Sequence, residues 1–266
     1  MRGVSADSLA RTREALAEIA GGDESLGTEL FAVARLLDSN GTLRRALTDP
    51  ARSGEAKSGM VEQLLQGKVS DNTLRVLRAA VSGRWSSSRD LPDALDDLSV
   101  EADVAYADEQ GKLDEVEDEL FRLERVVARE RALADKLGDR NLPLEKRQQL
   151  IRGLLEGKAD PATVRLAERA VAGRGRSFAG SLTAYQSAAA ARRNASIATV
   201  RVATDLSEAE RTRLSEALGR QYGRNIQLNV IVDPAVVGGV RVDIGDEVID
   251  GTIAAKLSDA QRRIAG

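Results

Sequence analysis

The chain has 266 residues and a net charge of −3, with 42% hydrophobic and 30% charged residues, which is an ordinary globular composition. It contains neither cysteine nor histidine, which excludes disulfides, the usual zinc sites and histidine-based acid–base catalysis. The net charge is not typical of a non-specific nucleic-acid binder, and no apolar run approaches the ~18 residues of a membrane span. An N-terminal apolar signal core is also missing, so we expect a cytoplasmic protein.

Aromatic residues make up only 3% of the chain, so alanine, leucine and valine must build the cores, which favours helices. Residues 1–97 predict a small helical bundle. Leu26, Leu30, Val33 and Leu37 recur at helical spacing, and Asn40-Gly41 stops that helix. Residues 89–110 contain no strong helix breaker after Pro92, which is tolerated near a helix start. We therefore expect one continuous helix that leads from this bundle into the next.

The chain repeats itself at an offset of 90 residues. Residues 29–84 and 119–174 share 18 identities in 56 ungapped positions, where chance gives about four. The recurring groups include Glu-Leu-Phe at 29 and 119, and Leu-Leu at 64 and 154. We call residues 29–84 the first repeat and residues 119–174 the second repeat. A duplicated helical bundle is the simplest explanation.

The pattern changes after residue 195. A strand with Val200 and Val202 precedes a helix that Ser207 and Glu210 open as a capping box, and two further strands follow. This order predicts a small mixed sheet covered by helices. The expected domains are therefore a helical bundle at 1–97, a second bundle at 98–195 and a small α/β domain at 196–266. The predicted fold is mostly α, with two tandem six-helix-type bundles before that domain.

The C-terminal part carries a distinctive series of turn and cap residues. Asp233-Pro234 ends one strand, and a glycine pair precedes a strand in which Val240, Val242 and Ile244 alternate with polar residues. Gly245-Asp246 suits a hairpin turn, and Asp250 or Thr252 is expected to cap a last helix with Ile253, Leu257 and Ile264. The residues that define the series are Asp233, Gly238, Gly239, Asp250 and Gly251.

This series resembles the C-terminal signature of the delta subunit of bacterial F-type ATP synthases, the family of the oligomycin sensitivity conferral protein. Residues 98–266 match the plan of that family, a helical bundle followed by a small α/β domain, and residues 1–97 are an extra bundle ahead of it. The resemblance implies a non-catalytic stator subunit in the peripheral stalk of a proton-translocating ATP synthase. Such a subunit links the catalytic alpha/beta head to the membrane-anchored stalk and resists rotor torque.

The same resemblance implies the partners and the location. The expected partners are the N-terminus of an alpha subunit, the C-terminus of the stalk b subunit and, as a further contact, a beta subunit, with no nucleic acid and no direct membrane insertion. The expected location is the cytoplasmic side of the plasma membrane, as a peripheral part of the complex. By analogy, a partner helix would lie between the helices at 98–110 and 161–172. The candidate groove residues are Val164, Ala167 and Val171, with Leu74, Leu77 and Val81 in the first repeat.

The alternatives are a free-standing helical adaptor that binds partner helices, which leaves the C-terminal signature unexplained, and an enzyme, for which no acid–base pair is evident. Gly67-Lys68 and Gly157-Lys158 lack the rest of a phosphate-binding loop and fit helix-ending glycines. The segment from Gly173 to Ser177 fits an interhelical turn better than an anion site. We predict no catalytic residue, no metal and no cofactor.

Overall fold

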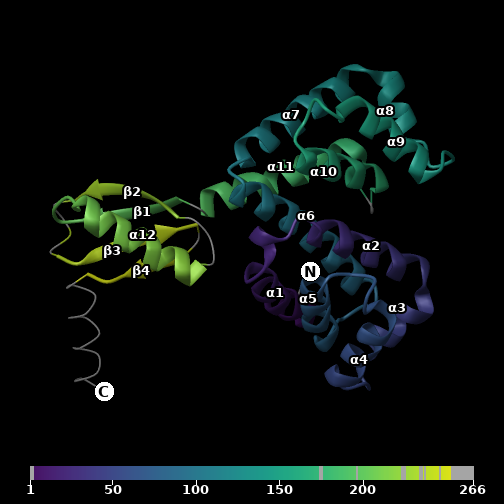
Figure 1. Cartoon of the computed structure of the whole chain (residues 1–266), viewed down its shortest axis with the longest axis horizontal. Helices are drawn as coiled ribbons and strands as arrows, with labels where there is room; N and C mark the ends of the chain where they lie inside the picture. The colour runs from purple at the N-terminus through teal and green to yellow at the C-terminus, as the bar shows by residue number, and fades with distance from the viewer. Residues whose placement is uncertain are drawn as a thin grey trace. The chain divides into compact units, whose positions relative to one another are not determined.

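The computed structural model describes residues 3–173, 176–195, 197–222, 226–233, 236, 238–245 and 247–252. It is mostly helical with a small mixed sheet near the C-terminus, as predicted (Figure 1). The chain forms two compact units, residues 1–189 and residues 190–266. The predicted division at 97/98 falls within a single helix, and the three-domain scheme stays a prediction.

The first unit is built of helices. They are α1 (Val4–Ala17), the 3-10 turn η1 (Ala20–Gly22), α2 (Leu26–Ser39), α3 (Gly41–Thr48), α4 (Gly54–Leu65), α5 (Asp71–Ser82), α6 (Asp90–Glu109), α7 (Leu113–Arg129), α8 (Arg131–Gly138), α9 (Leu144–Leu155), α10 (Pro161–Ala172) and α11 (Phe178–Ala195), which reaches into the second unit.

Helix α6 is the continuous connecting helix expected from residues 89–110. It is apolar on two sides, and each side belongs to a different hydrophobic cluster. Leu95, Leu98 and Ala102 pack in the first core cluster, which also contains side chains of α1 to α5. Val100 and Val104 pack in the second core cluster, which contains side chains of α7 to α11. The single helix α6 therefore contributes side chains to both core clusters.

The two repeats position their helices with the same polar contact. In the first, the Glu29 carboxylate on α2 accepts hydrogen bonds from the Ser70 backbone N–H (2.9 Å) and the Thr73 hydroxyl (2.6 Å) at the start of α5. In the second, Glu119 on α7 accepts from the Asp160 N–H (3.0 Å) and the Thr163 hydroxyl (2.6 Å) at the start of α10. Each glutamate satisfies free helix N-terminal donors. This contact explains why glutamate and threonine recur at the offset of 90.

A buried charge cluster holds the two core clusters together. The Asp103 carboxylate on α6, 1% exposed, lies 2.7 Å from Nη2 of Arg169 and 3.1 Å from Nε of Arg165, both on α10. Arg169 Nη2 also donates to the Gly27 carbonyl of α2 (3.1 Å), and its guanidinium lies over the Phe31 ring at 5.1 Å. A Cβ atom at Gly27 would stand 2.6 Å from the Asp103 carboxyl carbon, so only glycine permits this approach.

The second unit contains β1 (Ile197–Val202), α12 (Glu208–Tyr222), β2 (Gln227–Val232), β3 (Val240–Ile244) and β4 (Glu247–Asp250). The strand order is β2-β1-β3-β4, with β1 parallel to β2 and antiparallel to β3. Val200, Val202 and Val242 are buried with Leu218 of α12, which lies across the sheet (Figure 1). The predicted βαββ order lacks one strand, because β4 follows β3 after the turn at Gly245 and the described order is βαβββ. Asp246 and the expected last helix at 253–266 lie outside the described residues.

The first testable prediction concerns the charge cluster. Asp103→Ala should lower the free energy of unfolding by about 3–5 kcal/mol, because it leaves two guanidinium groups without their buried carboxylate. Asp118→Ala is the matched control: its partner is Arg122, both side chains are about 70% exposed, and the loss should stay below about 1 kcal/mol. Urea denaturation of the full chain measures both. Equal losses would contradict a structural role for the cluster.

A second prediction concerns the capping box of α12. The Glu210 carboxylate accepts hydrogen bonds from the Ser207 hydroxyl (2.6 Å) and N–H (2.8 Å), which hold the pKa of Glu210 below its ordinary 4.5. The cap therefore stabilises the helix above the unfolded-state pKa, and this stabilisation is lost as the pH falls through the folded-state pKa. In an NMR titration, Ser207→Ala should raise the pKa of Glu210 towards 4.5. An unchanged pKa would show that the hydroxyl contributes nothing.

Candidate partner-binding groove

Five of the six predicted groove residues lie in the two core clusters. Leu74, Leu77 and Val81 on α5 are buried in the first cluster. Ala167 and Val171 on α10 are buried in the second cluster, and Val164 is half-buried. All but Val164 therefore pack in the core of their own bundle, and a role in partner binding stays a prediction for all six.

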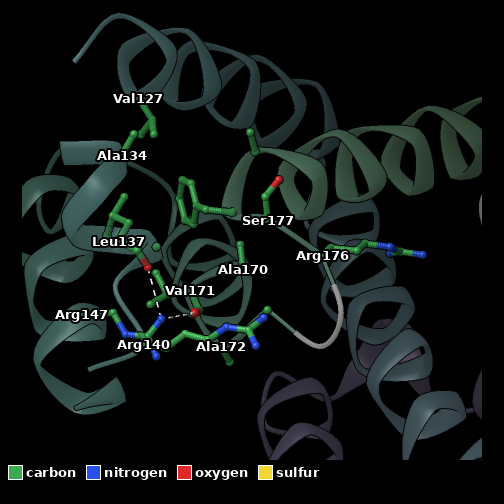
Figure 2. Close-up of a pocket in the computed structure, with 14 residues that line it drawn as sticks. Val127, Ala134, Leu137, Arg140, Arg147, Ala170, Val171, Ala172, Arg176 and Ser177 are labelled. Atoms are coloured by element: carbon green, nitrogen blue, oxygen red, sulfur yellow. Dashed lines mark hydrogen bonds between the residues drawn. The ribbon is translucent and has the colours of Figure 1, made fainter. Parts of the chain in front are cut away.

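Leu77 and Val81 line an apolar cavity in the first repeat, and Val171 lines a different cavity in the second repeat (Figure 2). The cavity of the first repeat measures about 300 Å³ and lies among α2, α3, α4 and α5. Leu36 on α2 and Leu64 on α4 also line it, and these two leucines are 40% and 41% exposed. A hollow with buried apolar residues inside and exposed leucines beside them can receive the apolar stripe of another helix. Its remaining lining residues are Val33, Leu37, Asn40, Leu43, Leu47, Val61, Leu65, Lys68 and Leu95.

The second repeat carries the same surface pattern. Val126 and Leu154, which correspond to Leu36 and Leu64, are 49% and 39% exposed. The apolar lining residues of the cavity all correspond to apolar residues in the second half of the bundle region: Leu123, Val126, Val127, Leu133, Leu137, Ile151, Leu154, Leu155, Ala167, Val171 and Tyr185. Helices α7, α8 and α9 therefore offer a second surface of the same chemistry.

The face between α6 and α10, where the resemblance places a partner helix, is polar and covered at its centre. Asp103, Arg165 and Arg169 meet there, and Glu24, just before α2, pairs with Arg165 at 2.8 Å. Arg169 is 3% exposed because α2 packs over it. Burial raises the pKa of the nearby Tyr185 phenol above its ordinary value, and the Arg169 cation opposes that shift.

Sequence reasoning placed Leu64 within a helix of the bundle and did not assign Leu36 or Leu64 to a binding surface. Both fit a helical apolar stripe, and periodicity cannot distinguish a leucine inside a core from one at the mouth of a groove. The available signal was the recurrence of Leu64-Leu65 as Leu154-Leu155, which points to a shared requirement without saying whether it is packing or binding.

The C-terminal signature residues form a tight turn region in the second unit. Gly238 and Gly239 have φ values of 111° and 82°, which favour glycine. A Cβ atom at Gly239 would lie 2.4 Å from the Gly251 carbonyl oxygen, and the Gly251 N–H donates to the Val240 carbonyl at 2.9 Å. The Asp250 carboxylate accepts from the Thr252 N–H at 3.0 Å, and the Asp233 N–H donates to the Val202 carbonyl at 2.8 Å. These contacts serve backbone geometry.

Other motifs in the chain also have structural explanations. Gly67 and Gly157 follow α4 and α9 with φ values of 74° and 72°, the left-handed conformation that ends helices. Among the described residues, no group of three or more acidic side chains is arranged to hold a metal ion. Within the same described part, no helix has the length and apolar character that crossing a membrane requires.

Comparison with known proteins identifies the family. Residues 100–264 match the profile of the ATP synthase delta (OSCP) subunit family. The chain is 48% identical over 241 residues to the ATP synthase subunit delta of Kineococcus radiotolerans, covering 90% of this chain and 87% of that protein. It is 43% identical to the subunit delta of Streptomyces griseus over the full length of both. For the Nocardioides subunit delta the identity is 44%, over 100% of this chain and 98% of the relative.

The chain therefore belongs to the ATP synthase delta (OSCP) subunit family. The family profile begins at residue 100, within α6, whereas the Streptomyces relative aligns from end to end. The extra N-terminal segment thus has a counterpart in relatives that carry the delta name.

A prediction follows from the glycine contact in the second unit. Gly239→Ala should unfold the β3–β4 region, because the new methyl group would collide with the Gly251 carbonyl and the backbone has a positive φ. Amide exchange of the described strands should rise at β3 and β4, with the helical unit unaffected. Gly138→Ala, where the added Cβ meets no atom within 4 Å, is the control and should leave exchange unchanged. Protected β3 amides in Gly239→Ala would disprove the steric argument.

Proposed function

We propose that this chain is a non-catalytic stator subunit of an F-type ATP synthase, which links the catalytic head to the peripheral stalk and resists rotor torque. The single observation that carries the proposal is the end-to-end match to proteins named ATP synthase subunit delta. The location that follows from this role is the cytoplasmic side of the plasma membrane, as a peripheral member of the complex.

The helical unit is proposed to hold the N-terminal helix of an alpha subunit. The groove of α2, α3 and α4, with Leu36 and Leu64 at the surface, has the apolar lining that an amphipathic helix requires. The related surface with Val126 and Leu154 supplies a second contact, to another alpha subunit or along the stalk. The small α/β unit is proposed to bind the C-terminus of the b subunit, and a beta subunit is a further contact.

The mechanics of the fold support this role. A joint that resists torque must transmit force without bending, and two bundles on a flexible linker would bend. Here α6 is shared by both core clusters, and the Asp103–Arg169 contact ties α10 to it. Two partner sites on one chain also gain affinity from their high effective concentration.

The test is a binding titration of the full chain with a labelled peptide of the cognate alpha subunit N-terminus. Leu64→Glu places a charge in the groove mouth of the first repeat and should weaken binding about tenfold if that groove is used. Leu154→Glu makes the same change in the second repeat. Both leucines are about 40% exposed, so the variants should fold. Leu142→Glu, 38% exposed and outside the cavity lining, is the control.

The pattern of losses assigns the sites. If only Leu64→Glu weakens peptide binding, the first repeat is the binding site. If both variants weaken it, both repeats bind the alpha-subunit peptide. Absence of peptide binding by the unaltered chain would refute the proposed alpha-subunit contact. Co-purification with the other ATP synthase subunits tests the stator role independently of the peptide.

A further inference from the structure

Strand β2 lies at one edge of the sheet in the second unit and has no charge or proline to protect that edge. The strand order β2-β1-β3-β4 makes β2 and β4 the two edges (Figure 1). Edge strands usually avoid pairing with other chains by being short or by carrying charges or proline. Strand β4 has four residues and is acidic at both ends, with Glu247 and Asp250. Strand β2 has six residues, Gln227–Val232, and none of them is charged or proline.

The outer edge of β2 presents backbone groups that β1 does not pair. All of β2 aligns in parallel with β1 without a bulge. The Asp233 N–H, one residue beyond the strand, donates to the Val202 carbonyl at 2.8 Å and so points towards β1. Backbone groups of successive strand residues point to opposite sides, so those of Leu228, Val230 and Val232 point to the outer edge. Among the described residues, no strand pairs with this edge.

The side chains along this edge are apolar on both faces of the sheet. Val232 lies on the face that α12 covers and is 50% exposed, whereas Ile231 lies on the opposite face and is 41% exposed. Leu228 and Val230 share the face of Val232 and pack against the core of this unit, yet they stay half-buried. An added strand covers all four side chains, and it gains most free energy if its own residues there are uncharged and apolar.

We propose that the outer edge of β2 is a docking site for an extended, uncharged segment of a partner polypeptide, which pairs with β2 as an additional strand. The backbone groups of Leu228, Val230 and Val232 supply the hydrogen bonds, and the side chains beside them select apolar residues. A helix does not fit this edge, because its own backbone groups are already bonded within the helix. The site differs in chemistry from the grooves of the helical unit, and it does not depend on the proposed contact between the α/β unit and the b subunit.

A second copy of the chain fits this edge less well. Two β2 strands related by a two-fold axis pair antiparallel, and the register that uses all three outward residues sets Leu228 opposite Val232 and Val230 opposite itself. The same register sets Ile231 opposite Asn229 of the other copy, which is an apolar side chain against an exposed amide. A different polypeptide can place an apolar residue there, so a partner segment is the expected occupant.

The experiment is an NMR titration of the amide-labelled full chain with a peptide in which valine and threonine alternate. Methyl groups on every second backbone nitrogen leave one edge of the peptide able to pair and prevent the peptide from aggregating. We expect saturable shifts and slower amide exchange at Leu228, Val230 and Val232. A peptide methylated on every backbone nitrogen should bind at least about tenfold more weakly. Equal binding of the two peptides, shifts confined to the helical unit, or no shifts at about 1 mM peptide would each overturn the proposal.

Matched proline variants identify the edge that is used. Val232→Pro removes one outward N–H from β2 without breaking its pairing with β1, because proline is tolerated where the N–H of an edge strand faces solvent. It should weaken peptide binding at least about tenfold. Val248→Pro on β4 is the control and should leave binding unchanged. The Gly251 N–H donates to the Val240 carbonyl, so the alternation along β4 turns the Val248 N–H away from β3 in the same way.

A second pair of variants keeps the test valid if proline disturbs the sheet. Val232→Lys places a charge beside the edge and should weaken binding of the uncharged peptide, whereas Val248→Lys should not, and both valines are exposed. Unchanged binding to both Val232 variants would overturn the proposal. A dimer of the unaltered chain that Val232→Pro dissociates, measured by sedimentation, would make a second copy the occupant and would also overturn it. None of these results depends on binding of the alpha-subunit peptide or of the b subunit.

Discussion

The buried carboxylate of Asp103 lies where three helices of the helical unit, α2, α6 and α10, meet. Burying a carboxylate and two guanidinium groups costs several kcal/mol of desolvation, which their close contacts must offset. The Gly27 carbonyl and the Phe31 ring add contacts to Arg169, and the glycine at position 27 lets α2 approach Asp103 closely. The contacts of this charge cluster connect α2, α6 and α10.

The duplication shows which features the bundle architecture requires and which can diverge. Both repeats use a glutamate to hold the start of a later helix, through Glu29 in one and Glu119 in the other. Arg75 and Arg165 are identical by offset but lie in different surroundings, because Arg75 pairs with an exposed glutamate and Arg165 with buried Asp103. The contacts that recur in both repeats hold the helices of each bundle together. The contacts that differ between the repeats join the two bundles or change the exposed surface.

The proposed role as a stator joint fits this distinction between contacts within each bundle and contacts between the two bundles. The shared helix α6 and the charge cluster connect the two core clusters, and the exposed residues Leu36, Leu64, Val126 and Leu154 are the surfaces proposed for partner helices. A stiff body with several chemically distinct contacts can hold neighbouring subunits in fixed directions while each contact keeps its own specificity.

The sequence by itself determined the helix pattern, the repeat, the continuous helix over 89–110 and the strand–helix–strand–strand part of the C-terminal unit, because these depend on local periodicity, caps and breakers. It also carried the family signature at Gly238-Gly239 and Asp250-Gly251. Only the tertiary structure decided that Leu77 and Val81 reach a groove, that Leu36 and Leu64 stay exposed and that Asp103 is buried against α10. These outcomes depend on which helix faces meet across long sequence separations, and the periodicity of a single helix does not contain that information.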